Sequence, residues 1–129
     1  MIAIENMEAV REVARSYPGL RLLVLHGSRA RGDSTIRSDW DFAYLGDENL
    51  DGMELRSRLV GALGRDDLDL ANLSRAGGLL NFQVACDGVA LFERDPGTFE
   101  EFCLQAATFW LDIEPVIRAE HEAILRALG

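Results

Sequence analysis

Two aspartates, Asp39 and Asp41, are separated by a single residue in a segment that alternates acidic and apolar side chains. Side chains two positions apart on a β-strand project to the same side of the sheet. The two carboxylates would therefore lie side by side, where they repel each other unless a cation lies between them. Because Mg²⁺ prefers oxygen ligands and commonly binds one or two carboxylates together with substrate phosphates, the pair predicts a magnesium site. A solvated strand face gives the same spacing, so the pair alone is weak evidence.

A third carboxylate could come from the next alternating segment, in which Asp67 and Asp69 would share one face of a strand while Leu68 and Leu70 share the other. If this strand lies beside the first, one of its aspartates joins the Asp39–Asp41 pair. Its role would be to help hold the metal and to accept a proton from an acceptor hydroxyl. An acidic edge strand explains the alternation equally well, and the alternation does not choose between the two aspartates.

A phosphate contact is predicted at Gly27-Ser28, which follows His26 at the end of the apolar run of residues 20–25. Glycine lets the backbone turn sharply and lets a ligand approach closely, and the N-terminus of a following helix offers free N–H groups to phosphate oxygens. Ser28 adds a hydroxyl, and Arg29 and Arg31 add positive charge. Gly-Ser is common in turns, so only its combination with the aspartates indicates a phosphate site.

Strands and helices must position these candidate residues, and the hydrophobic periodicity of the sequence predicts both kinds of element. Helical spacing predicts helices over residues 5–16 and about 50–63, the second closed by Gly64. Apolar or alternating runs predict strands over residues 20–25, 40–44, 67–73 and 89–93. We expect an α/β (α+β) fold in which a mixed β-sheet is flanked by helices.

The C-terminal half is expected to be largely helical. Ser74 is a candidate N-cap for a helix that runs to Cys86. Thr98 and Glu101 match a capping box at the start of a further helix. Pro115 should kink or break that helix, and the segment that follows, as far as Leu128, again has a helical pattern.

Composition narrows the class of protein. The chain has 129 residues and a net charge of −9, and such acidity is unsuited to holding long nucleic acids directly. No stretch of about 18 apolar residues occurs, so we expect no membrane span. Residues 1–5 are too short and too acidic to form a signal peptide. We therefore expect a single cytoplasmic domain over residues 1–129 that does not bind nucleic acid or membrane.

The spacing of the candidate residues resembles the nucleotidyltransferase superfamily typified by DNA polymerase β. Gly27-Ser28, ten intervening residues and Asp39-x-Asp41 are similar to its signature. The start Gly-Ser-x-Ala-Arg-Gly resembles the minimal nucleotidyltransferase (MNT) subfamily. Residues 69–80 resemble the strand with the third carboxylate and the helix after it, and residues 88–94 resemble the strand that closes the sheet. The resemblance covers residues 5–120, approximately.

The resemblance implies the nucleotidyltransferase fold, with ATP as substrate and Mg²⁺ as cofactor. The spacing to Leu73-Ser-Arg-Ala favours Asp69 over Asp67 as the third carboxylate. The implied site consists of the catalytic and metal-binding residues Asp39, Asp41 and Asp69 and the nucleotide-binding residues Gly27, Ser28 and Arg31.

MNT domains are typically antitoxins of HEPN/MNT toxin–antitoxin pairs, and the HEPN partner is an RNase. The resemblance therefore implies transfer of AMP from ATP to a tyrosine hydroxyl of a HEPN toxin, within a hetero-oligomer. The candidate carboxylates all lie in the first 69 residues, and too little chain follows for an acceptor-binding domain, so a docking partner must supply the acceptor. Two alternatives stay open: a small-molecule acceptor, as in aminoglycoside nucleotidyltransferases, and a non-catalytic antitoxin that masks its partner sterically.

Overall fold

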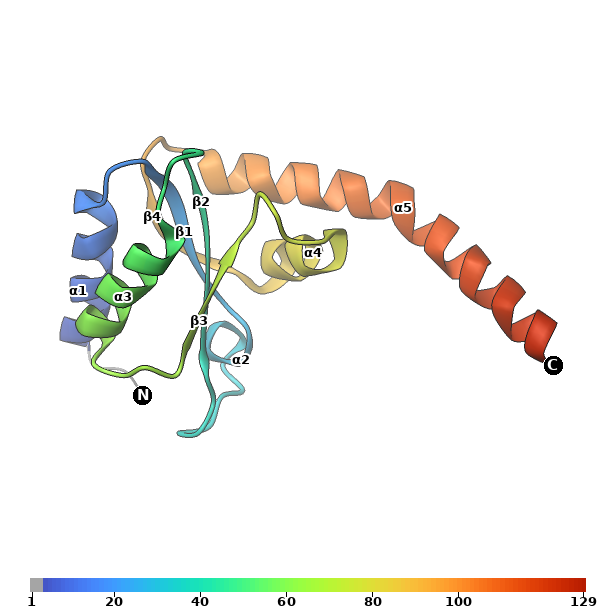
Figure 1. Ribbon diagram of the computed structural model, residues 1–129, viewed down its shortest axis with the longest axis horizontal. Coiled ribbons are helices and arrows are strands. Elements are labelled where there is room, and N and C mark those ends of the chain that lie inside the picture. Colours follow the sequence, from blue (N-terminus) through green and yellow to red (C-terminus); the bar gives the residue numbers. More distant parts are fainter. Residues whose placement is uncertain (1–3) are drawn as a thin grey trace.

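A four-stranded mixed β-sheet forms the centre of the computed structural model, which describes residues 4–129 (Figure 1). The strands β1 (Leu20–His26), β2 (Trp40–Gly46), β3 (Leu68–Asn72) and β4 (Val89–Glu93) lie in the order β3-β2-β1-β4. Strand β1 pairs antiparallel with both β2 and β4, whereas β2 pairs parallel with β3. The mixed sheet expected from the sequence is confirmed.

Helices cover both faces of this sheet. Helices α1 (Ile4–Ser16) and α3 (Gly52–Leu63) pack on one face, and α4 (Gly78–Asp87) and α5 (Thr98–Leu128) pack on the other (Figure 1). The short helix α2 (Ser28–Arg31) follows β1 directly. Because β1 is covered on both faces, its sequence is a nearly continuous apolar run, as is typical of strands buried on both sides.

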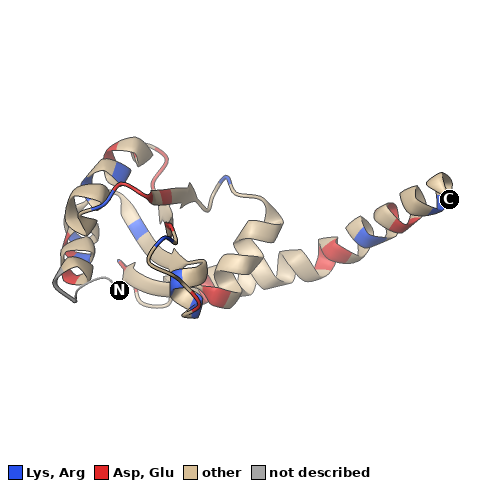
Figure 2. Cartoon of the chain, turned by 90° about the horizontal axis from the view of Figure 1, so that it is seen from below, with Lys and Arg blue, Asp and Glu red and all other residues tan. Residues whose placement is uncertain are grey.

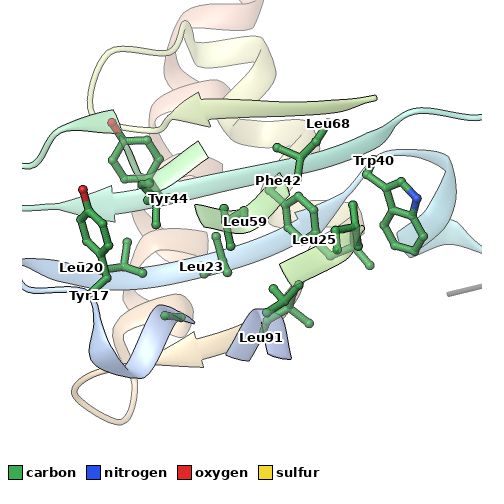
Figure 3. Packing of buried hydrophobic residues seen from close by; sticks show 14 residues of the cluster. Tyr17, Leu20, Leu23, Leu25, Trp40, Phe42, Tyr44, Leu59, Leu68 and Leu91 are labelled. Atoms are coloured by element: carbon green, nitrogen blue, oxygen red, sulfur yellow. The ribbon is translucent and has the colours of Figure 1, made fainter. Parts of the chain in front are cut away.

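The larger hydrophobic cluster lies between the sheet and helices α1 and α3. Strand β2 contributes Trp40, Phe42 and Tyr44, which point to the same side as Leu23 and Leu25 of β1 (Figure 3). The alternation predicted for residues 40–44 is therefore confirmed. The other buried members of this cluster are Val10, Ala14, Tyr17, Leu20, Leu55, Leu59, Leu63, Leu68 and Leu91.

A smaller cluster fills the opposite face, beneath α4 and α5. Its buried members are Leu22, Val24, Ala43, Leu73, Val84, Phe102 and Ala106. Since Ala43 of β2 lies on this face while Phe42 lies on the other, strand alternation turns the side chain of Asp41 toward the α4–α5 face. The candidate carboxylates thus belong to the side of the sheet that has the smaller apolar core.

The ends of helices α3 and α4 test the expected capping residues. Asp51 accepts hydrogen bonds from the N–H groups of Met53 and Glu54, each at 3.1 Å, and Gly64 ends α3 in the left-handed conformation, as expected. The expected N-cap at Ser74 is wrong, because α4 begins four residues later. The Ser74 N–H instead donates to the side chain of Asn72 in the turn after β3, at 3.0 Å.

Helix α5 also begins differently from the expectation. The Thr98–Glu101 capping box is wrong: the Thr98 hydroxyl donates to the carbonyl of Asp95 at 2.7 Å, and the side chain of Glu93 accepts from the Phe99 N–H at 2.8 Å. Pro115 does not break the helix, which runs to Leu128 and changes direction along its length (Figure 1). A proline removes one backbone hydrogen bond, and bending is the usual result. Within residues 4–129, no helix is both long and apolar enough to span a membrane.

Candidate nucleotidyl-transfer site

The register of β2 with its two neighbours decides which polar side chains meet. Asp41 is paired with Asp69 across the parallel β2–β3 ladder and with His26 across the antiparallel β1–β2 ladder. Asp39 lies one residue before β2 begins. The structure therefore places Asp69 directly beside Asp41, with Asp39 two residues away on the same side of the chain.

Asp67, the alternative third carboxylate, is already engaged. Its carboxylate accepts two hydrogen bonds from the guanidinium of Arg65, one of them at 2.6 Å from Nε, and this pair holds the pKa of Asp67 below its usual range. Asp69 is exposed and lies in the row formed with Asp41. The geometry thus agrees with the preference for Asp69.

The half-buried carboxylate of Asp41 is the electrostatic centre of this row. Burial is the main reason that the pKa of Asp41 is raised above its ordinary value, and the negative charges of Asp69 and Asp39 raise it further. The charges of His26 and Arg31 act in the opposite direction and lower it. A bound cation would stabilise the ionised carboxylate and so offset the cost of burial and the repulsion that raise this pKa.

Gly27 is required by the close approach of Asp41. Its backbone has φ +74°, and a Cβ built at this position would lie against the Asp41 carboxylate, 3.1 Å from Cγ. A side chain at residue 27 would therefore both strain the backbone and displace Asp41. The Gly27 carbonyl accepts from the N–H groups of Ala30 and Arg31 at 3.1 Å each and so begins the single turn of α2. Ser28, the first residue of that turn, is half-buried beside the carboxylate row.

The two arginines of α2 have different environments. Arg31 contacts the carboxylates of Asp33 at 3.3 Å and Asp87 at 3.6 Å, which keeps its charge near Asp41. Arg29, in contrast, stacks over the ring of Trp40 at 4.1 Å and donates to the carbonyl of Ser38 at 2.7 Å. Arg29 thus holds the loop that leads into Asp39. The structure shows its charge at this loop, whereas the sequence pattern predicted it at the phosphate site.

Sequence reasoning missed one residue near the row. His26 had no role in the predicted site, yet the β1–β2 register pairs it with Asp41 and its charge lowers the pKa of that carboxyl. The available signal was its position immediately before Gly27 at the end of a buried strand. That position only becomes informative once the β1–β2 register is known.

The donor set suits Mg²⁺, because three carboxylates supply the hard oxygen ligands that this ion takes. At the backbone level the residues are adjacent. Across residues 4–129, however, no three His, Cys, Asp or Glu side chains converge closely enough to form a ready-made metal cluster. Strand register brings the three carboxylates close together, and their side chains would have to reorient to share one ion.

Two hollows of the surface lie at the other end of the strands from the carboxylate row. One, of about 510 Å³, lies between the β3–α4 turn and α5 and is lined by Leu45, Leu73 and Asn81 among others. The second, of about 900 Å³, is lined by residues around Asp51 and Asn72. Neither is lined by Asp39, Asp41 or Asp69, of which Asp39 and Asp69 are exposed and Asp41 is half-buried.

Residues 8–97 of the chain match the family described as Polymerase beta, Nucleotidyltransferase. The chain belongs to this family. The match includes the Gly27 turn, the Asp39–Asp41 pair and Asp69, and it ends just before α5.

Curated relatives support the same assignment. The chain is 35% identical over 110 residues to a protein named protein adenylyltransferase MntA from Aphanizomenon flos-aquae, covering 76% of this chain and 73% of the relative. It is 28% identical over 128 residues to a protein of the same name from Shewanella oneidensis, covering 97% and 88% of the two chains.

Solved structures extend the likeness to nearly the whole chain. A toxin–antitoxin crystal structure with AMP-PNP contains a chain 29% identical to this one, with a TM-score of 0.74 over 95% of this chain and 98% of that one. A complex of a tri-AMPylated Shewanella oneidensis HEPN toxin with an MNT antitoxin gives 28% identity and a TM-score of 0.68, covering 95% of each chain. The nucleotidyltransferase fold expected from the sequence is thereby confirmed.

A first prediction concerns the Gly27 turn of this family member. Gly27→Ala should weaken ATP binding strongly, because the added methyl group displaces the Asp41 carboxylate and strains a backbone at positive φ. Isothermal titration calorimetry with MgATP measures the loss. Gly61→Ala is the matched control: it lies inside α3 with open space around it and should bind ATP normally and fold at least as stably. Equal ATP affinity in both variants would contradict the role of Gly27.

A second prediction uses the raised pKa of Asp41. An aspartate whose pKa is higher in the folded than in the unfolded state destabilises the fold when it is ionised, and this cost disappears as pH falls through the raised pKa. Asp41→Asn should therefore increase the melting temperature at neutral pH in EDTA, and it should reduce the stabilisation that the wild type gains on mild acidification.

Asp67→Asn is the control for that experiment. The pKa of Asp67 is lowered by Arg65, so its charge favours the folded state above the unfolded pKa, and its removal should give no increase in melting temperature. Thermal denaturation of both variants as a function of pH makes the comparison. A melting temperature for Asp41→Asn at or below that of the wild type at neutral pH would show that this carboxylate carries no electrostatic cost.

Proposed function

We propose that this chain is a Mg²⁺-dependent adenylyltransferase that transfers AMP from ATP to a tyrosine hydroxyl of a HEPN-type RNase toxin and thereby acts as its antitoxin. The observation that carries the proposal is the row of carboxylates Asp39, Asp41 and Asp69 beside the Gly27 turn. It is supported by 35% identity to a protein named protein adenylyltransferase and by likeness to an MNT antitoxin solved with a tri-AMPylated toxin.

The proposed reaction is an in-line displacement at the α-phosphorus of ATP. The tyrosine oxygen forms a bond to that phosphorus, the bond to the oxygen that bridges the α- and β-phosphates breaks, and pyrophosphate leaves. The proton of the tyrosine hydroxyl passes to the carboxylate of Asp69, which is exposed at the edge of the row. The acceptor therefore gains AMP through a phosphodiester bond to its ring oxygen.

The chain's own residues divide the remaining tasks. Asp39, Asp41 and Asp69 would hold Mg²⁺, which when bound neutralises the phosphates and the attacking oxygen. The backbone at Gly27 and the Ser28 hydroxyl would contact phosphate oxygens at the start of α2. Arg31, kept near Asp41 by Asp33 and Asp87, steadies the nucleotide with its positive charge.

A partner must bring the acceptor to this site. Asp39 and Asp69 are exposed at the surface, and none of the three carboxylates lines either of the two hollows described above. A tyrosine side chain on a docked protein can reach such an open surface. This favours a protein acceptor over the aminoglycoside-type alternative. We place the reaction in the cytoplasm.

The metal requirement gives a third prediction. ATP binding should weaken by roughly tenfold or more when EDTA replaces Mg²⁺, because the triphosphate would then face three carboxylates without a neutralising charge. Calorimetric titration under the two conditions is the measurement. If Asp67→Asn shows the same metal dependence as the wild type and Asp41→Asn loses it, the ion is assigned to the carboxylate row. Equal ATP affinity with and without metal in the wild type would exclude a metal-bridged site.

The fourth prediction tests the transfer itself. Co-expression with the HEPN-type toxin, separation under denaturing conditions and intact mass spectrometry should reveal toxin heavier by one or more AMP groups. Asp39→Asn should abolish this mass increase, because it removes a charged metal ligand while keeping the side-chain shape. Asp67→Asn should retain it. A toxin that stays unmodified but is inhibited equally by the wild type and by Asp39→Asn would identify the chain as a steric antitoxin instead.

A further inference from the structure

The last part of α5, from Pro115 to Gly129, forms an extension that we call the α5 arm. Every residue of the arm is exposed, and the arm projects away from the sheet and from the other helices (Figure 1). A helix of this length is only marginally stable alone in water, since most helical stability in proteins comes from packing of an apolar face. Within the described residues, nothing packs against the arm to stabilise it.

The arm has an apolar stripe that continues the buried face of α5. In the first half of the helix, Phe102 and Ala106 are buried and Trp110 stacks on Phe82 with ring centroids 5.8 Å apart. Helical spacing carries this face onward. The stripe starts at Ile113, just before the arm, and continues on the arm through Ile117, Ile124 and Leu128, which are 48%, 57% and 80% exposed. A face of this kind, unused by the chain itself, is typical of a helix that packs into a partner's groove.

We propose that the apolar stripe of the α5 arm is the docking surface for the acceptor protein, which covers it with an apolar groove carrying a cationic side chain opposite Glu120. This inference rests on the proposed function. Glu120 falls within the stripe, between Ile117 and Ile124 at helical spacing, so any partner that covers the stripe must satisfy a carboxylate at its centre.

Charge favours a basic partner over a second copy of this chain. From Leu111 onward, α5 carries four carboxylates, Asp112, Glu114, Glu120 and Glu122, against two arginines, Arg118 and Arg126 (Figure 2). Arg118 already pairs with Glu114 within the helix, at 3.1 Å. Two copies, each with a net charge of −9, would repel and would bring acidic arms together, whereas a basic surface gains from the same charges.

The position of the arm also suits delivery of an acceptor. Helix α5 packs on the face of the sheet toward which the Asp41 side chain is turned, and Ala43, two residues further along β2, is buried beneath α4 and α5. A protein held by the α5 arm is therefore on the side of the sheet that carries the carboxylate row. The row itself stays uncovered, so the docked protein can present a side chain to it.

The experiment compares two exposed apolar residues on different sides of α5. Ile117→Glu places a charge in the stripe, and Leu111→Glu places one on the other side of the helix, where Leu111 is 71% exposed. The probe is the purified HEPN-type toxin that serves as acceptor in the transfer assay, and its affinity is measured by calorimetry without ATP. We expect binding to Ile117→Glu to be weakened roughly tenfold or more, as for a residue at the centre of an interface, and Leu111→Glu to bind as the wild type does.

Steady-state transfer assays give an independent measure. Ile117→Glu should raise KM for the toxin and leave KM for ATP unchanged, because the α5 arm is remote from the nucleotide residues. Circular dichroism and melting curves confirm that both variants are folded. A variant matched in shape but without the charge, Glu120→Gln, should weaken toxin binding as well, since it removes the partner of the cation.

Three outcomes would overturn the docking surface: wild-type toxin affinity in both Ile117→Glu and Leu111→Glu, equal weakening in both, or a wild-type homodimer in light scattering that Ile117→Glu dissociates. Failure of the proposed function is a separate result. In that case the wild type and Asp41→Asn would bind the toxin equally through the stripe, and no AMP-sized mass increase would appear with either protein.

Discussion

The parallel pairing of β2 with β3 determines which carboxylates can act together. Leu68 and Leu70 alternate with Asp67 and Asp69, and Leu68 is almost completely buried on the α1–α3 side of the sheet. A shift of the ladder by one residue would expose these leucines and turn both aspartates into the core. The apolar side of β3 therefore fixes the register, and the register in turn places Asp69 next to Asp41. Chemistry at this end of the sheet is thus specified by hydrophobic burial on its opposite face.

This arrangement has an electrostatic cost that the fold must offset. Asp41 is half-buried, its pKa is raised by burial and by two neighbouring carboxylates, and only His26 and Arg31 act against that trend. The lack of a side chain at Gly27 leaves the room that this carboxylate occupies beside the turn. On the other side of β2, Trp40, Phe42 and Tyr44 are buried and anchor the strand. Packing on one side of the strand therefore holds charged groups in unfavourable proximity on the other, which is a common property of sites that bind metal and phosphate.

The sequence was sufficient to predict the strands and which candidate residues lie on or beside them, because alternation and long apolar runs are strong local signals. Helix starts were harder to predict. Ser74 and Thr98 have the residue types of N-caps, but Gly77 and Gly97 take those positions, since the backbone after β3 and after β4 turns through glycine before each helix begins. The choice between Asp67 and Asp69 needed either a family resemblance or the β2–β3 register, because alternation treats the two equally. The clamp of Arg29 on Trp40 and Ser38 was not predictable, since it joins residues across a loop that has no periodic pattern.

Both edges of the sheet are strands of only five residues, β3 and β4, whereas the two central strands have seven. An edge strand exposes unpaired N–H and C=O groups that can template the addition of a foreign strand, and short length and charged side chains are the usual protections. On β3 that charge is Asp69. The carboxylate proposed as the third ligand of the site thus also protects the sheet edge against the addition of a foreign strand, so that neutralising it should promote aggregation.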